Sequence, residues 1–280
     1  MKRRLILYIA LLFLLHTTAF TQTSAVVMTY NIRLNVKSDG ENWWENRKDK
    51  VAALMNYYEA DFIGAQEVQH EQLEYLLKTL PHYSSIGVGR DDGKTAGEYS
   101  CILYNNKNYR PVQQSTFWLS QTPDKVSMGW DAVCNRVCTY GLFEHITTKK
   151  KVWVFNTHFD HVGDTARYES AQLIMERVKQ LKSQQNYPVL FTGDFNSQPG
   201  DAPVQYISEH LKNTRMISKM PPYGPEATWN AFKFNEVPKG WIDYVFVSKE
   251  VTVQKYAVLT DSYDKKYPSD HFPVLVHITY

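Results

Sequence analysis

The stretch Pro188-Val189-Leu190-Phe191-Thr192-Gly193-Asp194-Phe195-Asn196 carries more structural information than any other part of the chain. Its first half is a short apolar run, typical of a buried strand, and Gly193 lets the backbone approach a neighbour closely. Asp194 and Asn196 are two residues apart, so on an extended chain both side chains point to the same side. One of them can accept a proton from a water molecule while the other binds that nucleophile or a phosphate oxygen. Because ligand crevices in α/β proteins form at the carboxyl ends of strands, the stretch favours an α/β fold with a polar site here.

The same pattern recurs along the chain. Asn31, Glu67 and His158 each stand at or just past the end of an apolar strand. Asp270 and His271 instead stand immediately before the last strand, and Asp243 lies near the start of another. If these last two strands run opposite to the others, all these polar residues meet at one rim of the protein.

Apolar periodicity predicts the remaining elements. Residues at helical spacing indicate helices that begin after Trp44 and that cover about 73–80 and 166–182. The predicted strands are 26–31, 62–66, 99–104, 117–119, 137–145, 151–157, 189–192, 241–247, 251–259 and 272–278, of which 99–104 to 151–157 follow one another as in a meander. These are too many strands for one open sheet of ordinary size, so we expect two sheets packed face to face, with helices on the outside.

The N-terminus has the pattern of a signal peptide. Three basic residues at 2–4 precede an apolar run, 5–15, and then small and polar residues follow. We therefore expect a signal peptide over residues 1–24, cleaved between Ala19 and Ala25, one domain over 25–280, and a periplasmic or secreted protein. The alternative is an uncleaved N-terminal anchor. A lipoprotein anchor is disfavoured because the first cysteine is Cys101. The apolar run is too short to span a membrane, which takes about 18 to 20 apolar residues, and no other segment approaches that length.

Charge and cysteine content narrow the classes of protein to which this chain can belong. The leader holds three of the 31 basic residues, which leaves 28 against 29 acidic residues and a charge near −1. Binding of nucleic acid by bulk electrostatics is therefore disfavoured. Three cysteines are an odd number for an exported protein, so a complete disulfide framework is excluded, and we interpret all three as small buried residues.

The polar residues of the rim are of a kind that binds hard cations. Glu67, Asp194 and Asp270 supply carboxylates, and Asn31 and Asn196 supply amides. Oxygen ligands suit Mg²⁺ or Mn²⁺, which are usually held by one or two carboxylates together with substrate phosphate. A single acidic residue after a strand is more often a turn or helix cap, so the prediction depends on their joint placement beside two histidines.

Six short motifs, in order, resemble those of the endonuclease/exonuclease/phosphatase superfamily. They are Thr29-Tyr30-Asn31-Ile32-Arg33, Gln66-Glu67-Val68, Asn156-Thr157-His158, Gly193-Asp194-Phe195-Asn196, Trp241-Ile242-Asp243-Tyr244 and Ser269-Asp270-His271-Phe272-Pro273. The resemblance spans the whole predicted mature chain and suggests an exported bacterial member. It implies a four-layered α/β sandwich with two central mixed sheets, and a hydrolase that cleaves phosphate esters with Mg²⁺ or Mn²⁺.

The resemblance also implies roles for individual residues. Glu67 resembles the principal metal ligand, with Asn31 and Asp270 near the metal. Asp194 and Asn196 resemble the pair that orients the attacking water and the phosphate. His271, held by Asp243, resembles a His–Asp pair that contacts the scissile phosphate, and His158 resembles the second histidine of deoxyribonuclease-like members.

Four further residues are candidates for substrate binding. Arg90 and Lys94 lie in a glycine-rich stretch, 87–95, whose spacing fits neither a P-loop nor a dinucleotide fingerprint. A solvated loop is the alternative for both, as a helix-surface charge is for Arg167 and core packing for Trp229. His161, three residues after His158, suggests zinc only weakly, because local spacing does not assemble three ligands.

We therefore expect an exported, monomeric, metal-dependent phosphoesterase that uses direct attack by water. A phosphodiesterase is favoured because of His158, with nucleic acid, a lipid head group or a small diester as substrate. The alternatives are a phosphomonoesterase acting on inositol phosphates or lipid head groups, and a catalytically silent binding module of the same fold.

Overall fold

The computed structural model describes residues 22–280, and its strands form two six-stranded sheets. The first sheet has the order β11-β12-β1-β2-β4-β3. In that order its strands are Thr252–Val258, Val274–Thr279, Ser24–Asn31, Phe62–Val68, Tyr99–Asn105 and Tyr83–Ile86. Within it β1 and β2 are parallel, whereas β12 is antiparallel to β1 and β4 is antiparallel to β2.

The second sheet repeats this mixed arrangement, with the order β5-β6-β7-β8-β10-β9. Its strands in that order are Tyr109–Trp118, Val137–His145, Lys151–His158, Val189–Asp194, Asp243–Val247 and Lys212–Asn213. Here β7 and β8 are parallel, and β10 is antiparallel to β8. Each sheet therefore has a central parallel pair flanked by antiparallel strands.

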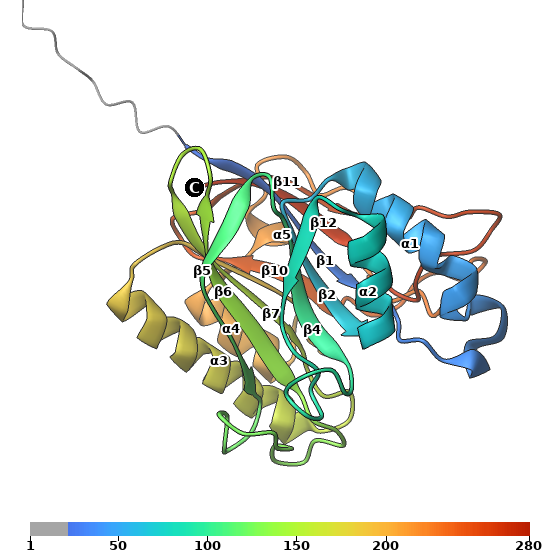
Figure 1. Cartoon of the computed structure of the whole chain (residues 1–280), viewed down its shortest axis with the longest axis horizontal. Helices are drawn as coiled ribbons and strands as arrows, with labels where there is room; N and C mark the ends of the chain where they lie inside the picture. Colours follow the sequence, from blue (N-terminus) through green and yellow to red (C-terminus); the bar gives the residue numbers. More distant parts are fainter. Residues whose placement is uncertain (1–21) are drawn as a thin grey trace, which may run out of the picture.

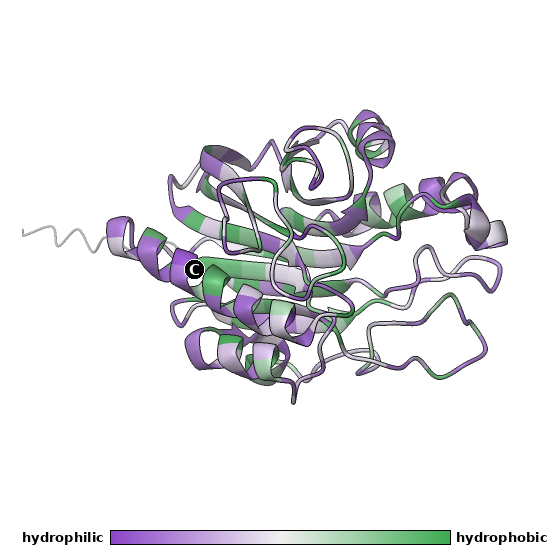
Figure 2. Ribbon diagram, turned by 90° about the horizontal axis from the view of Figure 1, so that it is seen from below, coloured by the Kyte–Doolittle hydropathy of each residue, from purple (hydrophilic) through white to green (hydrophobic). Residues whose placement is uncertain are grey.

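The helices cover the two outer faces of the sheets (Figure 1). Helices α1 (Trp44–Tyr58) and α2 (His70–Thr79) pack on the first sheet, and α3 (Asp164–Gln184) and α4 (Ala202–His210) pack on the second. A 3₁₀ helix (Lys37–Asn42) and the short α5 (Thr214–Ile217) complete the elements. Apolar residues of both sheets, such as Phe62 and Phe143, form the central core between them. The strands are accordingly the most hydrophobic part of the ribbon in Figure 2, and the helices show a polar outer side.

This architecture confirms the predicted four-layered sandwich with two mixed sheets. It also confirms that β10 and β12 run opposite to the strands that carry Asp194 and Asn31. The predicted meander was wrong in one respect, because β4 belongs to the first sheet and only β5, β6 and β7 form a meander in the second. The chain crosses between the sheets after Asn105.

A buried polar network joins the two sheets directly beneath the rim. The Asn156 amide donates hydrogen bonds to the carbonyl oxygens of Ala65 (2.9 Å) and Cys101 (2.8 Å) in the opposite sheet. Its carbonyl oxygen accepts from Gln66 Nε2 at 2.7 Å and from Thr192 Oγ1 at 3.0 Å. Because buried amides require partners, this network fixes the relative position of β2, β4, β7 and β8, whose ends carry the polar rim.

The predicted signal peptide lies outside the described residues except for its last three, Gln22 to Ser24. Thr23 and Tyr280 exchange two backbone hydrogen bonds of 3.0 Å, and Ser24 is the first residue of β1. The folded domain thus begins slightly before residue 25. Among residues 22–280 no helix is both long and apolar enough to cross a membrane.

Candidate active site

The polar residues predicted to share a rim do lie together, at the edge of a cleft between the two sheets. The cleft has a volume of about 540 Å³ and is lined by residues of both sheets. Glu67 comes from β2, His158 from the end of β7 and Asp194 from the end of β8. Asp270 and His271 enter from the loop before β12. The site is therefore formed where the ends of these strands meet, as the pattern of polar residues in the sequence indicated.

Glu67 is directed into the cleft by an irregularity in β2. The pairing of β2 with β4 shifts register between Ala65 and Val68, and Glu67 has a positive φ of 60°. Such backbone angles are uncommon outside glycine and cluster at functional sites. The two carboxylate oxygens accept hydrogen bonds from Asn31 Nδ2 at 3.0 Å and from the Leu34 N–H at 3.1 Å.

Asp194 is almost completely buried and is held at both oxygens. Oδ2 accepts from Asn31 Nδ2 at 3.0 Å, and Oδ1 accepts from the Asn196 backbone N–H at 3.0 Å. Burial, followed by the nearby Asp243 carboxylate, raises the pKa of Asp194 to about 7. A carboxylate with this pKa is suited to accept a proton near neutral pH. Gly193 is required next to it, since a Cβ there would lie 2.7 Å from the Thr157 carbonyl oxygen.

His271 and Asp243 form the predicted pair. His271 Nδ1 lies 2.9 Å from Asp243 Oδ2, and His271 Nε2 lies 3.8 Å from Asp194 Oδ2. Burial acts to lower the pKa of His271, but the carboxylates of Asp243 and Asp194 outweigh it and raise that pKa well above its usual value. The imidazole is therefore positively charged at neutral pH and presents a cation to the cleft.

His158 approaches the same oxygen of Asp194 as His271 does, but it differs from His271 in charge state. Its Nε2 is 3.1 Å from Asn196 Nδ2 and 3.4 Å from Asp194 Oδ2. Burial, and then the charges of Arg136 and Arg90, lower the pKa of His158 well below its usual value, so the ring is neutral. Two histidines in one cleft thus have different roles available to them: one supplies charge and the other a neutral hydrogen-bonding group.

The carboxylate oxygens of Glu67 and Asp270 fit a divalent cation, because carboxylates are the ligand type that Mg²⁺ and Mn²⁺ prefer. Asn31, predicted to lie near the metal, instead directs its Nδ2 at Glu67 and Asp194, and its Oδ1 accepts from the Arg33 N–H at 3.0 Å. Asp270 is buried close to Glu67, and burial followed by the charge of Glu67 raises its pKa. Two carboxylates forced together in this way are stabilised by a cation between them. We therefore regard Glu67 and Asp270 as the candidate metal ligands.

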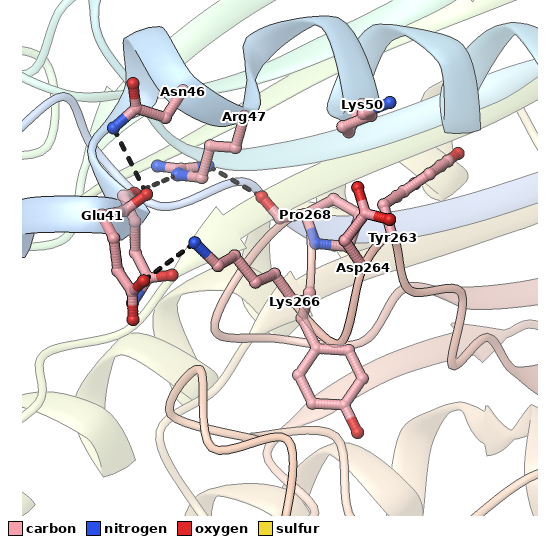
Figure 3. Close-up of a pocket in the computed structure, with 10 residues that line it drawn as sticks. Glu41, Asn46, Arg47, Lys50, Tyr263, Asp264, Lys266 and Pro268 are labelled. Atoms are coloured by element: carbon pink, nitrogen blue, oxygen red, sulfur yellow. Dashed lines mark hydrogen bonds and ion pairs between the residues drawn. The ribbon is translucent and has the colours of Figure 1, made fainter.

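A buried arginine ties together two loops beside these ligands. Arg47 of α1 donates from Nη1 to the carbonyl oxygens of Ile32 and Pro268, the latter at 3.1 Å. Its Nη2 donates to the backbone carbonyl oxygen of Arg33 at 2.7 Å. Figure 3 shows this side chain reaching Pro268 from α1 at the side of a small surface pocket. The loop after β1 and the loop before Asp270 are thereby fixed relative to each other.

The predicted substrate-binding residues divide into two groups. Arg90 and Trp229 line the cleft, and the Trp229 side chain remains 41% exposed. Lys94 is exposed and is not among the residues that line the cleft. Arg167 is engaged elsewhere, because its Nη1 donates to the Asp160 carbonyl oxygen at 3.0 Å and its Nη2 pairs with Asp164.

The sequence did not single out several residues that line the cleft. Arg33, Glu98 and Arg136 all contribute to it. Arg33 was quoted only as part of a motif, although Nη1 lies 3.7 Å from Glu67 Oε2. Arg136 precedes β6 much as Asp270 precedes β12, which was the available signal. Cys134 also borders the cleft, so the prediction that all three cysteines are buried holds only for Cys101 and Cys138.

A family model described as "Endonuclease/Exonuclease/phosphatase family" matches residues 28–271, nearly the whole described chain. The chain belongs to this family. Its enzymes hydrolyse phosphate esters, and both the sequence and the fold place the chain among them. The match confirms the resemblance carried by the six motifs.

Similar proteins extend this result. A solved endonuclease/exonuclease/phosphatase family protein from Bacteroides thetaiotaomicron is 38% identical, with a TM-score of 0.89, covering 93% of this chain and 96% of that one. A mannosyl-6-phosphatase from the same organism is 37% identical, with a TM-score of 0.89, covering 91% of this chain and all of that one. An uncharacterised protein of Acanthamoeba polyphaga mimivirus is 30% identical over 162 residues, which are 55% of this chain and 59% of the viral protein.

Proposed function

We propose that the protein is a divalent-metal-dependent phosphatase that hydrolyses the phosphomonoester of a sugar. The observation that carries the hydrolytic part is the geometry of the cleft: His271 Nε2 lies 3.8 Å from the buried Asp194 Oδ2, and His271 Nδ1 lies 2.9 Å from Asp243 Oδ2. Burial raises the pKa of Asp194, and, against the effect of burial, the two carboxylates raise the pKa of His271, which suits a base beside a cation. Attack of water on phosphorus is promoted by a base that accepts the water proton and by a nearby cation that stabilises the negative charge developing on the phosphate. A silent binding module would have no need of this costly arrangement of buried charges.

The chain's own residues divide the reaction between them. Asp194 accepts the proton of the attacking water, and Asn31 and the Asn196 N–H hold that carboxylate in place. As the water oxygen bonds to phosphorus, the bond from phosphorus to the sugar oxygen breaks, and the sugar leaves as an alcohol after taking a proton from solvent. His271, oriented by Asp243, donates a hydrogen bond to a phosphoryl oxygen and stabilises the negative charge that develops there. The Asn196 amide orients the phosphate. Glu67 and Asp270 would hold a Mg²⁺ or Mn²⁺ ion, which would supply further charge stabilisation when bound.

A sugar phosphomonoester is favoured over a long nucleic acid for two reasons. The mannosyl-6-phosphatase is 37% identical and similar over its entire length. The predicted mature chain also has a charge near −1, whereas binding to a polyphosphate backbone is strengthened by excess positive charge. We further propose that the protein is exported, because residues 1–24 have the signal-peptide pattern, and that it acts in the periplasm or outside the cell as a monomer.

A phosphodiesterase is the second candidate, and His158 is the observation that favours it. This neutral imidazole lies beside Asn196 and Asp194 within the cleft, where a diester would place a second substituent on phosphorus. The substrate would then be a small diester or a lipid head group. The preference for a diester predicted from the sequence stays a prediction.

The test is hydrolysis of mannose 6-phosphate, p-nitrophenyl phosphate and bis(p-nitrophenyl) phosphate by the protein from Thr23 onward, with Mg²⁺ or with EDTA. Asp194→Asn serves as the blank. We expect EDTA-sensitive release of phosphate from the two monoesters. Cleavage of the diester alone would replace the proposal by the second candidate, and no cleavage of any substrate would favour a binding module.

A further inference from the structure

Beside the catalytic residues, the cleft has a polar wall whose residues have no role in the reaction proposed above. It consists of Arg90, Glu98 and Arg136, and we call it the arginine–glutamate wall. Arg90 and Glu98 come from the loop between β3 and β4 of the first sheet, and Arg136 directly precedes β6 of the second. Arg90 Nη1 donates to Glu98 Oε2 at 2.8 Å. Both sheets thus contribute to this wall, as they do to the catalytic rim.

Arg136 is the residue that points to a ligand. It is only 5% exposed, yet its Nη1 has no hydrogen-bond partner among residues 22–280. The buried Nε of Arg90 also lacks one within the described chain. Buried guanidinium N–H groups nearly always find an acceptor, and leaving one unpaired is costly. Since both residues line the cleft, a substrate oxygen is the natural acceptor.

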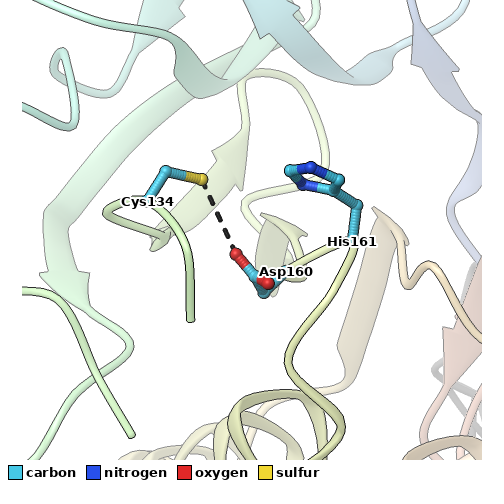
Figure 4. A group of neighbouring side chains, drawn as sticks. All are labelled: Cys134, Asp160 and His161. Carbon is cyan, nitrogen blue, oxygen red and sulfur yellow. Dashed lines mark hydrogen bonds between the residues drawn. The ribbon is translucent and has the colours of Figure 1, made fainter. Parts of the chain in front are cut away.

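The neighbouring group of Cys134, Asp160 and His161 does not turn this wall into a metal site. Figure 4 shows the three side chains together, with the Cys134 thiol directed at the Asp160 carboxylate at 3.6 Å. Asp160 is already used by backbone N–H groups, including Gly163 at 2.8 Å and Val162 at 3.0 Å. Arg136 Nη2 lies 2.9 Å from His161 Nδ1, so a cation there would face a guanidinium. The group supports Arg136 instead.

The charges of the wall select the class of ligand. Arg90 is paired with Glu98, and Arg136 lies 3.5 Å from Asp160, so each guanidinium has its own carboxylate. A second phosphate would be repelled by these carboxylates. A hydroxyl group, in contrast, donates to a carboxylate and accepts from a guanidinium at the same time. The wall therefore suits a neutral group with several hydroxyls.

We propose that the arginine–glutamate wall binds the hydroxyl groups of the sugar whose phosphate is cleaved. This inference rests on the proposed function. Trp229, half exposed and paired through its backbone with His271, supplies an apolar surface in the same cleft for the face of the ring. The catalytic residues bind the phosphate, and the wall selects the phosphate esters whose sugar hydroxyls it can bind.

The test compares two monoesters that differ in the leaving group. Mannose 6-phosphate offers hydroxyls to the wall, and p-nitrophenyl phosphate offers none. In Glu98→Gln and Arg136→Lys we expect kcat/KM for mannose 6-phosphate to fall at least about tenfold, as when a site loses hydrogen bonds to substrate hydroxyls. For p-nitrophenyl phosphate we expect a change of less than about twofold. Equal losses for both substrates, or no loss for either, would overturn the proposal.

A matched control is available in Glu144→Gln. Glu144 pairs with Arg110 at 2.7 Å on the second sheet, outside the cleft, and should leave both rates unchanged. If Arg136→Lys does not fold, the isosteric variant Glu98→Gln alone tests whether the wall binds the sugar. Calorimetric titration of mannose 6-phosphate into Asp194→Asn, with and without Glu98→Gln, needs no turnover. Weaker binding in the double variant supports the wall even if the wild-type protein proves inactive, and equal binding refutes it.

Discussion

At the residue scale, the proposed reaction depends on Asp194 as the acceptor of the water proton. Replacing it by Asn keeps its size and keeps an oxygen for the hydrogen bond from Asn31. The fold should persist, and turnover should fall by at least about a hundredfold, the usual effect of losing a general base. Steady-state kinetics and the melting temperature, measured together, check both expectations.

The control for this change is Asp124→Asn, because Asp124 is an exposed acid 3.9 Å from Arg177 and outside the cleft. It should leave turnover unchanged. Wild-type turnover in Asp194→Asn would remove this residue from the mechanism, and a large fall in both variants would show that the effect is one of net charge.

Glu67 is the second residue whose role can be separated by substitution. Glu67→Gln keeps the side-chain length but removes the negative charge from the candidate metal site, so the cation should bind more weakly. We expect the Mg²⁺ concentration for half-maximal activity to rise at least about tenfold, a difference of about 1.4 kcal/mol in binding. Titration of activity with Mg²⁺ measures this. Unchanged metal dependence would show that another residue is the main ligand.

At the scale of elements, the sequence predicted best those strands that are buried on both faces. β1, β2, β7 and β8 have almost continuous apolar runs, so both their existence and the polar residues at their ends were visible. β5 was predicted only at its end, because it is an edge strand whose middle is polar and partly exposed and contains Pro111 at an irregularity.

The arginine–glutamate wall shows why part of the site escaped prediction. Glu98 and Arg136 lie in loops of different sheets, and no periodic pattern relates them. Their proximity follows from how the sheets pack, which the sequence does not display locally. Lys94 illustrates the converse: it follows Arg90 closely in a suggestive glycine-rich stretch, but the loop turns its side chain towards solvent.

The start of α3 provides a prediction about pH. Asp160 accepts hydrogen bonds from the N–H groups of Val162 and Gly163, just before the helix begins. Burial acts to raise its pKa, but the Gly163 and Val162 N–H groups outweigh it and hold that pKa below its usual value. Its stabilising contribution is therefore present above the unfolded-state pKa of about 3.9 and is lost as the pH falls through the lower folded-state pKa.

Asp160→Asn should accordingly destabilise the protein at pH 7 by about 1–3 kcal/mol, the cost of weakened buried hydrogen bonds. The gap in melting temperature between this variant and the wild type should narrow as the pH is lowered from 5 to 3. Thermal unfolding at several pH values measures the gap, with Asp124→Asn as a control that shows none. A gap that stays constant down to pH 2.5 would refute the role given to the ionised carboxylate.

At the scale of the whole molecule, Thr23 holds both sheets together at the end opposite the cleft. It exchanges two backbone hydrogen bonds of 3.0 Å with Tyr280, next to β1 and β12 of the first sheet. Its hydroxyl lies 2.9 Å from that of Thr148, in the turn between β6 and β7 of the second sheet. Removal of the predicted signal peptide after residue 24 would break these contacts, so we expect cleavage before Thr23.

This expectation is tested by two versions of the chain, one beginning at Thr23 and one at Ala25. The shorter version loses about three hydrogen bonds, each contributing roughly 0.5–1.5 kcal/mol, and its melting temperature should be lower by on the order of 5 °C. Its kcat should be unchanged, because the site lies at the other ends of the same strands. N-terminal sequencing of exported protein should give a first residue at or before Thr23. Equal melting temperatures would show that the contacts of Thr23 contribute nothing to stability. A mature chain that begins at Ala25 would show that cleavage during export removes these contacts.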